Sequence, residues 1–162
     1  MSHKAIDPAA VVAYMARMKE EYPDTKVYIG TDSSRYKVKG VWYADYTLVL
    51  CVHIGARHGC KVFAEIQTEK DYDANASRPF SRMMNEAKKA VEMHERFKDI
   101  LQDFEVYIHL DINPKESAGS NVAASAALGY VKGCTNVTPI LKPMALAASF
   151  AADRAQDLAI AV

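Results

Sequence analysis

Hydrophobic residues recur along the chain at two spacings, one typical of strands and the other of helices. In the segment 61–67, Val62, Ala64 and Ile66 alternate with other residues, as in a strand with one buried face. In the segment 79–101 the apolar stripe instead follows a helical spacing. With the turn residues, these patterns predict a helix from Asp7-Pro8 to Tyr22, strands 26–33, 41–54 and 61–67 with a turn at 34–40, a helix 79–101, a strand 104–111, a helix from 117 to Gly133, a strand 137–141 and a helix 144–160.

The order of these elements specifies an α/β fold. Short turns join the first three strands, which favours an antiparallel meander. The later strands alternate with helices, and such connections form right-handed parallel crossovers. Placing the fourth strand beside the first gives a five-stranded mixed sheet, ordered 3-2-1-4-5 and flanked by helices, in a single domain over residues 1–162. The switch point of that sheet, where α/β folds build their sites, lies between the carboxyl ends of strands 1 and 4.

Two aspartates are predicted at this switch point. Asp32 ends the first strand and Asp111 ends the fourth. Either of them alone is best interpreted as a strand-end residue that caps the following turn. As a pair on adjacent strands, however, their negative charges would repel unless a cation lay between them. We therefore interpret Asp32 and Asp111 together as a functional site.

Two further acids are candidates for the same site. Glu86 lies in the second turn of the predicted long helix, where solvent-exposed glutamates are common. Asp153 follows ten uncharged residues in an alanine-rich segment, and a salt bridge would also explain it. Asp157 lies one turn later on the same helix face and competes with Asp153. Glu65 is a poorer candidate, because its strand is expected two strands away from the site.

These carboxylates predict a site for hard divalent cations. Asp32, Glu86, Asp111 and Asp153 would suit two Mg²⁺ or Mn²⁺ ions rather than zinc. Two such ions about 4 Å apart act on the attacking and leaving oxygens of a phosphodiester. The chain has 20 Lys plus Arg and 20 Asp plus Glu, so its net charge is zero, whereas nucleic-acid binders are usually basic. If metal neutralises four acids, the balance becomes 20 − 16 = +4.

Composition limits the class of protein. The 162 residues are half hydrophobic, which is enough to build one core. No apolar run reaches the roughly 18 residues needed to span a bilayer, and the first residues do not resemble a secretory signal. The three scattered cysteines, Cys51, Cys60 and Cys134, match neither a disulfide framework nor a zinc spacing. We therefore expect free thiols in a reducing compartment, a cytoplasmic location and no membrane partner.

Several segments carry a resemblance to a known family. The stretch 29–34, Ile-Gly-Thr-Asp-Ser-Ser, resembles the first strand of ribonuclease H. The order of elements after residue 25 is also similar to that fold. The chain is further similar to the YkuK-like family of predicted ribonuclease-H-like proteins, in the segments 30–33, 109–114, 142–143 and 147–154. The resemblance implies a ribonuclease-H-like fold and, by analogy, cleavage of nucleic acid.

The resemblance also implies roles for individual residues. By analogy with ribonuclease H, the catalytic metal ligands are Asp32, Glu86, Asp111 and Asp153. The chain departs from that enzyme because it has no histidine in the segment 135–143. Either Lys142 substitutes for that histidine or the chain has no such group. It also has no inserted basic handle for gripping hybrids, so RNA, DNA and hybrid substrates all stay open, as does the oligomeric state.

Two further features allow both a functional and a structural interpretation. His109 precedes Asp111 by two residues, so both side chains point to the same face; it could assist the site or simply pack in the core. Arg35, Lys37 and Lys39 alternate along the first hairpin. They could steer a phosphate backbone or form a solvated basic face.

Three functions are compatible with the sequence. The leading hypothesis is a metal-dependent nuclease that hydrolyses phosphodiesters of nucleic acid by a two-metal mechanism. The alternative is a non-catalytic adaptor of the same fold that binds nucleic acid or protein. An actin-like phosphotransferase ranks last, because the chain is short for two such domains and lacks a second phosphate loop.

Overall fold

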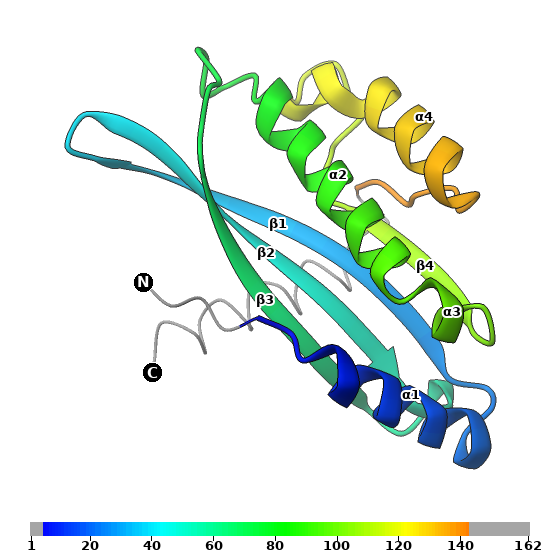
Figure 1. Cartoon of the computed structure of the whole chain (residues 1–162). Coiled ribbons are helices and arrows are strands. Elements are labelled where there is room, and N and C mark those ends of the chain that lie inside the picture. The colour runs from blue at the N-terminus through cyan, green and yellow to red at the C-terminus, as the bar shows by residue number, and fades with distance from the viewer. Residues whose placement is uncertain (1–4, 143–162) are drawn as a thin grey trace.

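The computed structural model describes residues 5–142 and forms an α/β arrangement in which a sheet is covered by helices (Figure 1). The last predicted helix, 144–160, lies outside the described residues. In chain order the elements are α1 (Pro8–Glu21), β1 (Lys26–Val38), β2 (Val41–His53), the 3-10 turn η1 (Ile54–Ala56), β3 (Cys60–Lys70), α2 (Phe80–Arg96), the short α3 (Lys98–Leu101), β4 (Glu105–Leu110), the 3-10 turn η2 (Gly119–Ala123) and α4 (Ala124–Thr135).

The sheet has four strands in the order β3-β2-β1-β4, so the predicted five-stranded sheet is corrected to four. β2 runs antiparallel to β1 and β3, whereas β4 runs parallel to β1. The predicted fifth strand is reduced to one parallel bridge, His109↔Ile140, on the expected side of β4. At this bridge, the Ile140 amide donates a hydrogen bond to the Ile108 carbonyl at 2.8 Å. The neighbouring Pro139 has no amide hydrogen to donate, which works against a longer ladder.

The first hairpin is longer than the sequence pattern predicted. β1 continues to Val38 in register with β2, where a turn over 34–40 was expected. The turn consists of Lys39 and Gly40 alone, both with positive φ angles (47° and 84°). A two-residue turn of this kind matches the twist of the strands that it joins, so pairing continues to the tip. The hairpin therefore projects beyond β4 and the helices (Figure 1).

The helices differ from the predicted ones mainly at their ends. The long helix 79–101 is divided into α2 and α3, because Phe97 adopts a non-helical conformation (φ −114°, ψ 16°). α4 begins after a 3-10 turn and passes through Gly133, where a stop was predicted. Asn136 ends it in the left-handed conformation, with φ at 59°, a role that asparagine can fill in place of glycine. Within residues 5–142, no helix is both long and apolar enough to cross a membrane.

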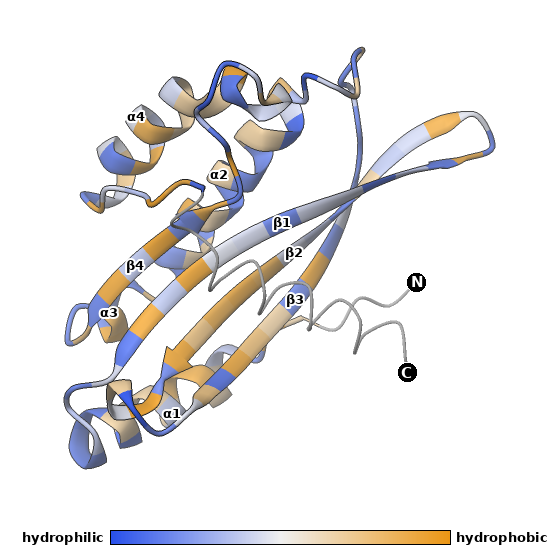
Figure 2. Ribbon diagram, turned by 180° about the vertical axis from the view of Figure 1, so that it is seen from behind, coloured by the Kyte–Doolittle hydropathy of each residue, from blue (hydrophilic) through white to orange (hydrophobic). Residues whose placement is uncertain are grey.

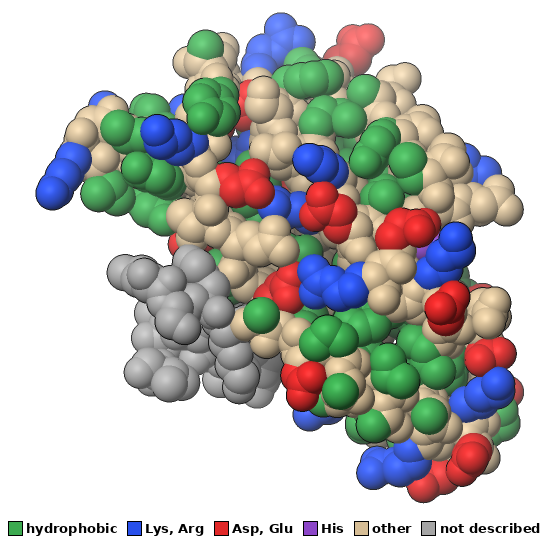
Figure 3. All heavy atoms as spheres, in the orientation of Figure 1, with side chains coloured by type: hydrophobic (Ala, Val, Ile, Leu, Met, Phe, Trp, Pro, Cys, Tyr) green, Lys and Arg blue, Asp and Glu red, His purple; other side chains and the backbone are tan. Residues whose placement is uncertain are grey.

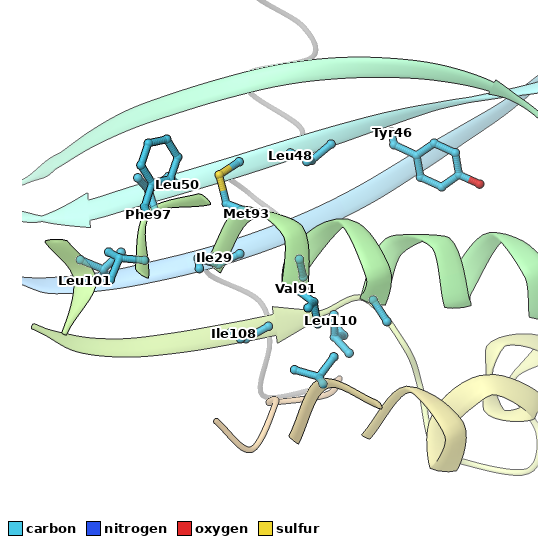
Figure 4. Packing of buried hydrophobic residues seen from close by; sticks show 14 of the residues in the cluster. Ile29, Tyr46, Leu48, Leu50, Val91, Met93, Phe97, Leu101, Ile108 and Leu110 are labelled. Atoms are coloured by element: carbon cyan, nitrogen blue, oxygen red, sulfur yellow. The ribbon is translucent and has the colours of Figure 1, made fainter. Parts of the chain in front are cut away.

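The main core lies between the sheet and the helices. Side chains from β1, β2 and β4 meet α2 and α3 there (Figure 4), and the labelled members include Ile29, Leu48, Leu50, Met93, Phe97, Ile108 and Leu110. α1 joins the same core through Val11, Met15 and Met18. Viewed from behind, the sheet has these helices on its far side (Figure 2). A smaller apolar cluster, Val49 and Cys51 with Tyr28 and Ala64, belongs to the other face of the sheet.

Candidate acidic site at the β1–β4 switch point

Asp32 and Asp111 lie next to each other on adjacent parallel strands. The last registered pair between β1 and β4 is Thr31↔Leu110, and each aspartate follows one member of that pair. Neighbouring strands lie roughly 4.8 Å apart. Thr31 and Leu110 are buried toward the helices, so the alternation along each strand directs both aspartates to the opposite face. The two carboxylates therefore share one face of the sheet.

Asp32 does not end its strand, contrary to the prediction. β1 runs six residues further, to Val38, while its pairing with β4 stops at Thr31. Asp32 thus marks the point at which the β1–β4 ladder ends. That end of the ladder is the switch point of the sheet, the position at which α/β folds place ligands.

Glu86 approaches this part of β1 from α2, on the face that carries Thr31 and Ser33. Its side chain is 0% exposed, so the interpretation as a solvated helix residue is wrong. One carboxyl oxygen, Oε1, accepts a hydrogen bond from the Ser33 hydroxyl at 2.5 Å, and the Glu86 backbone carbonyl accepts one from the Thr31 hydroxyl at 3.0 Å. The other oxygen, Oε2, has no hydrogen-bond partner among residues 5–142. Both β1 hydroxyls therefore fix this turn of α2 against the strand that carries Asp32.

The environment keeps Glu86 protonated at neutral pH. Burial raises the pKa of Glu86 from its ordinary value of 4.5 to about 8, because a buried carboxylate loses its hydration. The hydrogen bond from Ser33 opposes this change, and the negative charge of Asp32 adds to it. Like the Ser33 hydrogen bond, the positive charges of Arg82 and Lys142 lower the pKa of Glu86 and favour its ionised form. Glu86 is thus close enough to Asp32 and Lys142 to respond to both.

A cationic side chain contacts the second aspartate. The ammonium of Lys142 forms an ion pair with Oδ1 of Asp111. Its backbone amide donates to the Ile112 carbonyl at 3.1 Å, which holds the lysine beside the end of β4. The sequence had suggested Lys142 as a substitute for the histidine of ribonuclease H. In the structure it neutralises one carboxylate of the acidic pair.

Other candidate residues have structural partners. Glu65 is buried, and its carboxylate accepts hydrogen bonds from the Arg96 guanidinium at 2.8 and 3.0 Å and from the Ile6 amide at 3.0 Å. His109 is 5% exposed, and its ring packs edge-on against Tyr28 at 5.4 Å. Glu65 is therefore an ion-pair residue on β3, two strands away from β1, whereas His109 lies buried on the same sheet face as Asp111.

Sequence reasoning did not single out Ser33. Its hydroxyl is the group that contacts Glu86. The signal was available, because Ser33 stands two residues after Thr31 and must share its sheet face. The importance of that position appears only once α2 is known to cover this face of β1.

The described residues contain part of the predicted metal site. Asp32 and Asp111 follow the last registered pair of β1 and β4, and Glu86 approaches β1 from α2 on the face that carries Ser33. Residues 5–142 hold no group of three or more His, Cys, Asp or Glu side chains arranged around a common metal position. Asp153 and its rival Asp157 lie outside the described residues.

The order β3-β2-β1-β4, with a meander followed by a parallel crossover and acids at the switch point, defines an α/β protein of the ribonuclease-H-like class. The chain belongs to the ribonuclease H-like family, whose model matches residues 9–157. The similarity to the YkuK-like proteins is consistent with that assignment. No curated protein and no solved structure shows a significant match to the chain. Membership of this family indicates a nuclease or another nucleic-acid-related function.

Proposed function

We propose that the protein is a metal-dependent phosphodiesterase that hydrolyses nucleic acid. The observation that carries the proposal is the placement of Asp32 and Asp111 where the β1–β4 ladder ends, with the buried carboxyl of Glu86 close enough for the charge of Asp32 to raise its pKa. Acids are rarely gathered in this way unless a cation or a reaction requires it, because their charges destabilise each other. Family membership adds nucleic acid as the substrate class.

The residues at the switch point fit a hard divalent cation by their chemistry. Oε2 of Glu86 is a buried oxygen without a hydrogen-bond partner in the described chain, and Asp111 already holds the positive charge of Lys142. Carboxylate oxygens are the ligands that Mg²⁺ and Mn²⁺ prefer. Asp32, Asp111 and Glu86 would hold the metal, with Asp153 as the proposed fourth ligand. Mg²⁺ or Mn²⁺ ions bound there would supply positive charge for the oxygens of the scissile phosphodiester.

The chain's own groups have separate parts in this proposal. The carboxylates of Asp32 and Asp111 face the side of the sheet where substrate would lie. Ser33 orients the carboxyl of Glu86 through its hydrogen bond. Glu86 must lose its proton to bind a cation, and a positive charge nearby lowers its pKa in the required direction. Lys142 must release Asp111 or share it with the metal.

A cleavage and melting assay tests the proposal. Labelled RNA, DNA and hybrid are incubated with Mg²⁺ or Mn²⁺ and with wild type, Asp32→Asn or Asp111→Asn; Asp24→Asn, which changes an exposed turn residue, is the matched control. Wild type and the control should cleave and the two site variants should not. Divalent ions should raise the melting temperature of wild type. At a hundredfold excess over the dissociation constant, the free energy of unfolding should rise by roughly 2.7 kcal/mol. Without metal, the site variants should be at least as stable as wild type, because one like charge has gone.

The ion pair between Lys142 and Asp111 favours a second function, a nucleic-acid-binding or protein-binding adaptor without catalysis. An internal lysine in place of a metal would neutralise the pair permanently. Nucleic-acid binding without cleavage, together with a melting temperature that divalent ions leave unchanged, would establish the adaptor. Metal-free Asp32→Asn protein that is much less stable than wild type would make the aspartates structural and end the nuclease proposal.

A further inference from the structure

The part of the first hairpin that projects from the sheet differs in charge from the rest of the chain. We call residues 35–43 the arm. β4 pairs with β1 only as far as Thr31, β3 pairs with β2 as far as Tyr43, and the Trp42 carbonyl accepts a hydrogen bond from the Asp71 amide at 2.9 Å. Only the tip of the arm is therefore a free two-stranded ribbon. It contains Arg35, Lys37 and Lys39, and no acid occurs between residues 32 and 45. A chain with zero net charge thus carries three basic residues on this one element, and Lys and Arg side chains are visible on the part that projects (Figure 3).

Interactions within the arm give it a defined shape. The Trp42 ring lies under the Arg35 guanidinium at 4.1 Å and near the Lys37 ammonium at 5.3 Å. On the opposite face of the ribbon, Tyr36 stacks on Tyr43 with their ring centres 6.1 Å apart. A two-stranded hairpin alone is marginally stable in water. These contacts, of about 1 kcal/mol each, favour one conformation of the ribbon.

Arg35 anchors the arm to the body of the protein. Its Nε contacts the Asp71 carboxylate at 2.5 Å, its guanidinium donates to the Asp73 carbonyl at 2.8 Å, and its side chain is 12% exposed. The charge of Arg35 is therefore balanced inside the protein. Lys37 and Lys39 are exposed, and so the charge that the arm offers to a partner comes from these two residues.

The dimensions of the arm point to a duplex. A two-stranded ribbon fits the major groove of B-form DNA, whereas the major groove of A-form RNA is too deep and narrow.

We propose that the arm binds double-stranded DNA and holds its phosphates through Lys37 and Lys39. The inference rests on the proposed function and extends it by naming a substrate class. The exposed side chains of Val38 and Val41, at 46% and 42%, are suited to apolar contacts inside a groove. Trp42, already covered by Arg35, supports the ribbon and is not needed to stack on bases.

Binding measurements test the arm separately from catalysis. Full-length Asp32→Asn protein in a chelating buffer is titrated into a labelled 20-base-pair DNA duplex at several salt concentrations. The variant Lys37→Gln/Lys39→Gln removes two phosphate contacts and should reduce the slope of log affinity against log salt by about 1.8. A fourfold rise in salt would then weaken the binding of the unmodified arm by about twelvefold more than it weakens the binding of the arm variant. The matched control Lys61→Gln/Lys98→Gln removes the same charge from exposed positions outside the arm and should keep the wild-type slope.

The test also compares other nucleic acids and measures the oligomeric state of the protein. Single-stranded DNA and duplex RNA should show a smaller change of slope in the arm variant. An unchanged slope on the DNA duplex would overturn the proposal. So would an arm-dependent dimer seen by light scattering, which would assign the arm to a second copy of the chain; lysines also protect exposed strand edges from such pairing. If the arm is needed for DNA binding but the wild-type protein cleaves no nucleic acid, the proposal for the arm stands and the proposed nuclease activity is refuted. The failure of one proposal is therefore distinguishable from the failure of the other.

Discussion

Replacing Glu86 with glutamine should stabilise the metal-free protein at neutral pH. The unfolded carboxyl loses its proton near pH 4.5, whereas the folded one holds it until about 8. Between these values the native state binds a proton that the unfolded state lacks, so wild-type stability falls as the pH rises. Each pH unit corresponds to about 1.36 kcal/mol. At pH 7 the loss is therefore about 3 kcal/mol, and it reaches about 5 kcal/mol above pH 8.

Glutamine avoids this loss because it has no proton to release. Its side-chain oxygen can still accept the Ser33 hydrogen bond that Glu86 accepts. Glu86→Gln and wild type should therefore have similar stability at pH 4.5, and the variant should be more stable at pH 7. For a chain of this size, about 3 kcal/mol corresponds to a rise of roughly 6–12 °C in melting temperature.

The assay is urea unfolding from pH 4.5 to 8 in a chelating buffer, since a bound cation would favour the ionised carboxylate. Glu92→Gln is the matched control, because Glu92 is exposed on the same helix. Its stability relative to wild type should change little with pH. Two results would refute the reasoning. One is a Glu86→Gln variant that is less stable than wild type at pH 7, and the other is a difference in free energy of unfolding between variant and wild type that stays the same at every pH.

Three further predictions follow from single contacts. Arg96→Met leaves Glu65 buried without its ion-pair partner, and urea unfolding should show a loss of about 2 kcal/mol, reduced from the fully buried case because Arg96 is partly exposed. Gly119→Ala would place a Cβ 1.7 Å from a backbone oxygen of the neighbouring loop, so the melting temperature should fall as the loop is displaced, at a cost of about 1–3 kcal/mol. Lys142→Met removes the ammonium from Asp111, and calorimetry should show severalfold tighter Mn²⁺ binding; weaker binding would mean that the lysine supports the site.

Hydrophobic periodicity predicted most of the individual elements. The alternation in β3 and the helical stripe in α2 are local, because each depends on which side of one element is buried. The short connections then implied the meander and the parallel crossover, and the strand order β3-β2-β1-β4 confirms that part of the topology. The same order placed Asp32 and Asp111 on neighbouring strands, since the carboxyl ends of parallel strands meet at one edge.

The sequence pattern predicted the bounds of two strand segments less well. The segment 34–38 was predicted as a turn, yet it is a strand in register with β2. Its alternation of Arg35 and Lys37 with Tyr36 and Val38 is compatible with a strand, but no buried face marks it as one. The segment 137–141 has the residues of a strand but forms one bridge. Strand pairing depends on the partner as well as on the segment, and a single sequence does not display the partner.

By itself, the sequence determined that Asp32 and Asp111 are neighbours, because strand order and side-chain alternation are enough to place them. Only the tertiary structure decided that Glu86 is buried and protonated, that Ser33 holds it and that Lys142 contacts Asp111. These three features depend on the rotation of α2 over the sheet and on the path of the chain after α4. Packing of the whole core sets both, since turning a helix by one residue moves a side chain by about 100°.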